Sequence, residues 1–167
     1  MESVITLVAR DRRQVTTDLV ALTKPRVLAM VLVTTLVGYD VGLTGSADYL
    51  RMIHLLIGTL LAAGGTLALN QYSERDIDAW MDRTRARPLP AGRLQPLEAL
   101  LFGVALTLLG TAYLAALVGA LVALVTAATA ILYLFAYTPL KQRTALCTLV
   151  GAVPGALLLG LLAFDRT

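Results

Sequence analysis

The chain alternates between long apolar stretches and short charged segments. The apolar stretches cover residues 27–44, 52–69, 99–140 and 146–164. A membrane-spanning helix needs about 20 apolar residues. The third stretch has 42 residues without a charged side chain, so it predicts two helices joined by a tight turn near Val118 and Gly119. The pattern therefore predicts an all-α polytopic transmembrane bundle of about five spans.

The first 23 residues follow a different pattern. Acidic and basic side chains are mixed there, and no continuous apolar core is present. A cleaved signal peptide has such a core. We therefore expect residues 1–23 to form a cytosolic arm, for which an amphipathic surface helix is one form, and residues 24–167 to form one transmembrane domain.

Composition supports a membrane protein. Of the 167 residues, 57% are hydrophobic and 15% are charged, whereas a soluble domain carries about 25% charged residues. Disordered, collagen-like and disulfide-stapled chains are excluded, and the single cysteine, Cys147, cannot form an internal disulfide. The net charge of +3 is small. We expect the lipid bilayer as the surroundings and no nucleic-acid partner.

The distribution of basic residues predicts the orientation. Twelve Lys and Arg side chains lie in the N-terminal arm through Arg26, in the loop after residue 69 and just after Leu140. Only Arg51 and Arg166 lie on the opposite side. Basic loops stay in the cytoplasm. This bias predicts a multi-pass protein of the cell (inner) membrane with a cytoplasmic N-terminus.

An acidic motif follows the second apolar stretch. Asn70, Glu74, Asp78 and Asp82 are four residues apart, so in a continued helix they form one stripe. Carboxylate and amide oxygens suit Mg²⁺, which also accepts substrate phosphates as ligands. The alternative is a solvated loop whose acids pair with nearby arginines. The position of Asn70 at the end of an apolar span favours a functional role, because polar groups at that depth are costly.

A second polar group ends the fourth predicted span. Tyr137 and Lys141 are four residues apart, and Arg143 follows. Such side chains can bind diphosphate oxygens or simply anchor a helix at the lipid headgroups. Arg83 and Arg87 have two similar interpretations, as diphosphate ligands or as cytoplasmic loop charges. Together the two groups predict a cytoplasm-facing cavity for a lipid diphosphate.

Several segments resemble the UbiA-type intramembrane prenyltransferases, and in particular those that act on haem. The resemblance spans residues 22–156. It is carried by Leu-Thr-Lys-Pro-Arg at 22–26, Arg-Thr-Arg-Ala-Arg-Pro-Leu-Pro at 83–90, Tyr-Thr-Pro-Leu-Lys at 137–141 and Thr-Leu-Val-Gly-Ala-Val-Pro-Gly-Ala at 148–156.

This resemblance implies a nine-helix bundle with two aspartate-rich motifs over one cavity. It also implies Mg²⁺ as cofactor, and farnesyl diphosphate and haem B as substrates that form haem O. The implied metal ligands are Asn70, Glu74 and Asp78, with Asp82 peripheral. The implied diphosphate ligands are Arg83, Arg87, Tyr137, Lys141 and Arg143. No side-chain nucleophile is needed, and we expect His54 to be an interfacial residue.

The chain departs from the family pattern after residue 156. The second aspartate-rich motif and the last spans are expected there, and the sequence does not contain them. We therefore expect a truncated, N-terminal part of such an enzyme, whose partner would be a second half-protein or a haem-handling membrane protein. Two other interpretations stay open: a prenyltransferase of an aromatic or quinone precursor, and an inactive membrane fragment.

Overall fold

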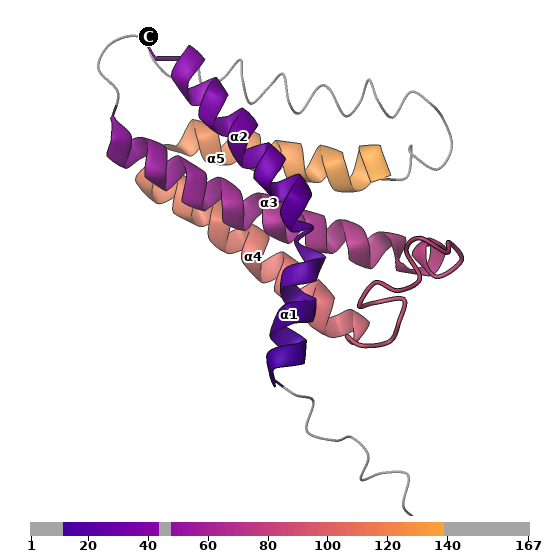
Figure 1. Ribbon diagram of the computed structural model, residues 1–167. Coiled ribbons are helices and arrows are strands. Elements are labelled where there is room, and N and C mark those ends of the chain that lie inside the picture. Colours follow the sequence, from indigo (N-terminus) through magenta and orange to yellow (C-terminus); the bar gives the residue numbers. More distant parts are fainter. Residues whose placement is uncertain (1–11, 44–47, 139–167) are drawn as a thin grey trace, which may run out of the picture.

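A computed structural model describes residues 12–43 and 48–138 (Figure 1). This part of the chain consists of helices and connecting loops, without a strand, which confirms the predicted all-α class. The elements are α1 (Arg12–Leu22), α2 (Pro25–Val41), α3 (Tyr49–Asp78), α4 (Pro96–Leu117), α5 (Ala120–Ile131) and a π-helical turn, η1 (Leu132–Tyr137).

The helices match the predicted apolar stretches. Three segments are long and apolar enough to cross a membrane: α3, α4 and α5 continued through η1. Counting α1 and α2 as one span bent by 50° gives a fourth. The predicted hairpin is confirmed, because α5 begins after Gly119, whose φ of 151° few residues other than glycine adopt. The fifth predicted span, 146–164, lies outside the described residues.

Helix α3 is the central element (Figure 1). Its 30 residues correspond to a length of about 45 Å, which exceeds the roughly 30 Å hydrocarbon core of a bilayer. The Asp48 carboxylate accepts hydrogen bonds from the backbone N–H groups of Leu50 and Arg51 and thereby caps the start of the helix. The C-terminal turns of α3 therefore extend past the apolar segment.

Glycines bring α3 and α4 into direct backbone contact. A Cβ atom placed on Gly65 would lie 2.5 Å from the backbone nitrogen of Thr107 and 2.7 Å from the carbonyl oxygen of Gly103. One placed on Gly110 would collide with the backbone of Ala62. Small residues allow this approach in membrane helices. The two helices therefore form one closely packed pair.

The loop between α3 and α4 is folded against the bundle. Leu89 and Leu94 are buried in a cluster with Leu22 of α1, Ala68 of α3 and Ala99 of α4. This cluster holds α1 and the loop against α3 and α4. The helical α1 also shows that part of the predicted arm is structured.

The η1 turn interrupts the last described span. The hydroxyl of Thr138 donates to the carbonyl of Tyr133, five residues earlier, at 2.9 Å. The rings of Tyr133 and Tyr137 stack with centroids 5.0 Å apart. A π-turn is a local widening of a helix and is frequent at functional sites. Here the wider turn leaves the side chain of Thr138 facing Asn70 of α3.

Candidate functional site

Three predicted metal ligands lie on one buried face of α3. The exposed fractions of Asn70, Glu74 and Asp78 are 1%, 7% and 5%. Successive members are four residues apart, which corresponds to about 6 Å along the helix axis. These residues are helical and buried, which contradicts the solvated-loop alternative; the pairing with a nearby arginine that it also expected is present at Asp78.

The fourth member of the predicted stripe is not part of it. Helix α3 ends at Asp78, so Asp82 lies in the turns that follow and its side chain is 94% exposed. Its carboxylate pairs with Arg85 at 3.2 Å. The prediction of a four-residue stripe is therefore wrong for Asp82, because it assumed that the helix continues.

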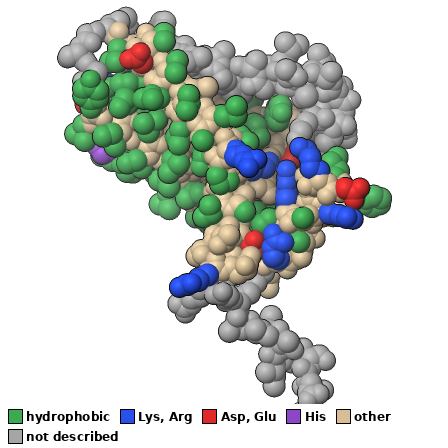
Figure 2. Space-filling model, viewed as in Figure 1, with side chains coloured by type: hydrophobic (Ala, Val, Ile, Leu, Met, Phe, Trp, Pro, Cys, Tyr) green, Lys and Arg blue, Asp and Glu red, His purple; other side chains and the backbone are tan. Residues whose placement is uncertain are grey.

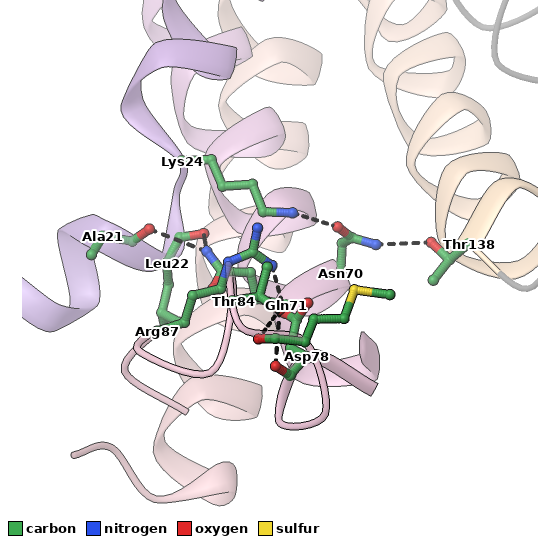
Figure 3. A network of polar contacts seen from close by, with 10 residues as sticks. Ala21, Leu22, Lys24, Asn70, Gln71, Asp78, Thr84, Arg87 and Thr138 are labelled. Carbon is green, nitrogen blue, oxygen red and sulfur yellow. Dashed lines mark hydrogen bonds and ion pairs between the residues drawn. The ribbon is translucent and has the colours of Figure 1, made fainter. Parts of the chain in front are cut away.

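Arg87 reaches back from the loop to the stripe. Its guanidinium forms a hydrogen-bonded ion pair with the carboxylate of Asp78 (Figure 3). The hydroxyl of Thr84 donates to the carbonyl oxygen of Asp78 at 2.9 Å. Asp78 is buried, whereas the Arg87 side chain is 29% exposed. The loop thus supplies a cation at one end of the stripe.

A second cation lies at the other end of the stripe, and sequence reasoning did not assign it to the site. The Lys24 ammonium donates to Asn70 Oδ1 at 2.7 Å. Asn70 Nδ2 donates in turn to the Thr138 hydroxyl at 3.1 Å. Figure 3 shows these groups in one line from the α1–α2 junction to the end of η1. The position of Lys24 before Pro25, at the start of a span, is the sequence signal that could have found it.

The other predicted site residues are not joined to this network in the described part of the chain. Arg83 is exposed, and Tyr137 is half-buried and stacked on Tyr133. Lys141, Arg143 and Cys147 lie outside the described residues. His54 hydrogen-bonds through Nδ1 to the Tyr113 hydroxyl at 2.7 Å, sixteen residues before Asn70 on α3.

The donor set fits a hard cation that shares its shell with a substrate. Within residues 12–43 and 48–138, no three His, Cys, Asp or Glu side chains are placed to hold a metal by themselves. Glu74 and Asp78 nevertheless provide two buried carboxylates on the same face of α3 as the Asn70 amide. Mg²⁺ in proteins is held by one or two carboxylates together with substrate phosphates. The residues therefore fit Mg²⁺ bound with a diphosphate.

An apolar cavity of about 170 Å³ lies between α2, α3 and α5. Its wall includes Ala62 and Thr66 of α3, Val27 and Val31 of α2, and Tyr133 of η1. Thr66 precedes Asn70 by one helical turn, so the cavity wall and the polar stripe share a face of α3. An elongated apolar group bound there would lie next to the stripe.

Comparison with known proteins identifies the family. Residues 31–164 match the UbiA prenyltransferase family, and the chain belongs to this family. No solved structure gives a match.

Several curated relatives carry the name protoheme IX farnesyltransferase. The protein of Solibacter usitatus is 47% identical over 149 residues, which cover 84% of this chain and 51% of the relative. The protein of Myxococcus xanthus is 44% identical over 147 residues, which cover 86% of this chain and 48% of the relative. The protein of Salinibacter ruber is 44% identical over 140 residues, which cover 84% and 50%. The chain spans about half the length of these relatives.

Proposed function

We propose that this chain provides the first metal-binding half of an intramembrane farnesyltransferase that acts on haem. The reaction transfers the farnesyl group of farnesyl diphosphate to a vinyl group of haem B, with addition of water, and gives haem O and diphosphate. The observation that carries the proposal is the buried stripe of Asn70, Glu74 and Asp78 beside an apolar cavity. The names of the curated relatives support haem as the acceptor.

The proposed roles of the residues follow from their chemistry. Asn70, Glu74 and Asp78 would hold Mg²⁺, which when bound offsets the negative charge that develops on the departing diphosphate. Arg87 would bind diphosphate oxygens, because a guanidinium offers several donors in a planar array. The apolar cavity would hold part of the farnesyl chain and exclude water from it. No step requires a side-chain nucleophile.

Further members of the diphosphate site belong to the proposal on the basis of the family resemblance. Tyr137, Lys141 and Arg143 would contact the diphosphate from the end of the span that contains η1. Asp82 would be peripheral at most, because its side chain is exposed. A second aspartate-rich motif would complete the metal site.

The proposed location is the cell (inner) membrane, with the N-terminus and the loop 79–95 in the cytoplasm. Basic side chains gather toward one end of the face shown in Figure 2, and hydrophobic side chains gather toward the other end. This distribution supports the orientation, because cytoplasmic loops are enriched in Lys and Arg. In this orientation the stripe lies at the cytoplasmic end of the bundle, where a soluble diphosphate product can leave.

The function can be tested in membranes that contain this chain together with the unmatched half of the Solibacter usitatus relative. Farnesyl diphosphate, Mg²⁺ and haem B are added, with 4-hydroxybenzoate as competing acceptor, and the products are identified by mass spectrometry. We expect haem O to form and the benzoate to stay unmodified. Prenylated benzoate without haem O would instead indicate an aromatic acceptor. No prenylated product in any mixture would indicate a non-catalytic membrane protein.

A further inference from the structure

The junction between α1 and α2 has an unusual backbone. Lys24 has φ 49° and ψ 68°, and no other non-glycine residue in the described part of the chain has a positive φ. This left-handed conformation is costly for a residue with a Cβ atom, and Pro25 follows directly. Strained residues persist where the surrounding structure holds them, and they cluster at functional sites. The conformation of Lys24 therefore requires an explanation.

Helix α3 holds this junction in place. Gln71 Nε2 donates to the carbonyl oxygens of Ala21 and Leu22, at 3.1 and 3.0 Å. Leu22 itself is fully buried. The Ala21 carbonyl oxygen also accepts a hydrogen bond from the backbone N–H of Lys24 at 3.2 Å, so the last turn of α1 and the junction share this acceptor. Because Gln71 is the neighbour of Asn70 in the sequence, the junction and the stripe are fixed to the same turn of α3.

The held junction directs the Lys24 ammonium to a proposed metal ligand. Lys24 donates to Asn70 Oδ1, while Thr138 accepts from Asn70 Nδ2 and thereby fixes the orientation of the amide. A bound cation at Asn70 Oδ1 would compete with the ammonium, because both would use the same oxygen and repel each other. The Arg87 guanidinium would likewise compete with a bound cation for the carboxylate of Asp78. The stripe thus carries an internal cation at each end.

We propose that Lys24 is a diphosphate-binding residue that serves as a counter-ion of the stripe when no substrate is bound. This inference rests on the proposed function. When a divalent cation takes the oxygen of Asn70, the ammonium turns to the diphosphate that arrives with it. The strained backbone places the ammonium within reach of both positions. Lys24 and Arg87 would then hold the diphosphate from opposite ends of the stripe.

The proposal predicts two opposite effects of one substitution. In the purified full chain, Lys24→Met should strengthen binding of Mn²⁺ alone, because the competing ammonium is gone. It should weaken Mg²⁺-dependent binding of inorganic diphosphate by about tenfold or more, which corresponds to the loss of one charge-assisted hydrogen bond. Mn²⁺ binding is followed by electron paramagnetic resonance and diphosphate binding with a radiolabelled ligand.

Two further variants make the test specific. Lys24→Arg keeps a cation at the junction and should retain most of the diphosphate affinity, so it separates a charge effect from misfolding. Arg26→Met removes an exposed cation two residues away and should change neither affinity. Unchanged diphosphate binding in Lys24→Met, or weaker Mn²⁺ binding, would overturn the role of Lys24. The same measurements on the chain assembled with the unmatched half of the Solibacter usitatus relative test the proposed function separately. If that assembly bound neither ligand, the proposed function would fail, and this inference with it.

Discussion

At the scale of single residues, the ion pair between Asp78 and Arg87 combines a structural and a functional role. Asp78 is buried, so removal of its charge leaves the guanidinium of Arg87 beside a neutral group. Unpaired buried charges cost several kcal/mol, and partial exposure of Arg87 reduces that cost. The loop 79–95 thus depends on the same contact that prepares the site.

Asp78→Asn is therefore expected to lower the free energy of unfolding by about 1–3 kcal/mol, as measured by denaturant titration in detergent micelles. Asp82→Asn is the matched control, because its pair with Arg85 is exposed and should contribute less than about 1 kcal/mol. Adding Arg87→Gln to Asp78→Asn should recover part of the loss. Equal effects of the two Asp→Asn variants would contradict the structural role of the buried pair.

The stripe could be predicted from sequence because it depends on one helix and one period. Asn70, Glu74 and Asp78 need only a helix that continues past the apolar span. Lys24 could not be found in this way, because its contact with Asn70 joins residues 46 positions apart. That contact depends on the bend between α1 and α2. Asp82 lies off the helical stripe for a local reason, since periodicity does not show that α3 ends at Asp78.

At the scale of helices, the closest contact is between α3 and α4. The uncharged stretch 99–140 and the glycine at its centre were sufficient to predict the hairpin that follows α4. The backbone contact through Gly65, Gly103 and Gly110 was not predicted. Glycines in apolar spans are common, and the sequence alone does not show which of them face a neighbouring helix.

Two adjacent glycines provide a direct test of this contact. Gly65→Ala should destabilise the protein by about 1–3 kcal/mol, because its new methyl group meets backbone atoms of α4 that cannot rotate away. Gly64→Ala should be tolerated, since its nearest neighbours would be side-chain atoms 3.5 Å or more away. Both are compared by thermal unfolding in the same detergent. An unchanged unfolding temperature of Gly65→Ala would show that α3 and α4 can move apart without loss of stability.

At the scale of the whole molecule, charge is concentrated where the site lies. Arg87, Arg93 and Lys24 each contact acidic or amide oxygens of the described residues. The same basic residues on which the proposed orientation rests therefore also hold this end of the bundle together. Arg93, for instance, pairs with buried Asp18 and joins the loop to α1.

The proposed orientation can be tested with single cysteines in a Cys147→Ser background. Asp82→Cys lies in the loop after α3 and Asp40→Cys near the far end of α2, and both positions are exposed. A membrane-impermeant maleimide added to intact spheroplasts should label position 40, and position 82 only after lysis. The reverse pattern would place the N-terminus outside the cytoplasm.

The wide turn η1 has a consequence for the chain lengths that this span tolerates. In a regular helix, deletion of one residue rotates everything that follows by about 100°. Deletion of exposed Leu124 in α5 should therefore turn Thr138 away from Asn70. Deletion of exposed Phe135 should only convert the π-turn into α-helix and keep the two side chains together. Cysteines placed at positions 70 and 138 in the Cys147→Ser background report this contact by oxidative cross-linking. The cross-link should persist after deletion of Phe135 and vanish after deletion of Leu124. A related protein could then lose one residue within this turn and still keep the residue that follows the turn facing α3.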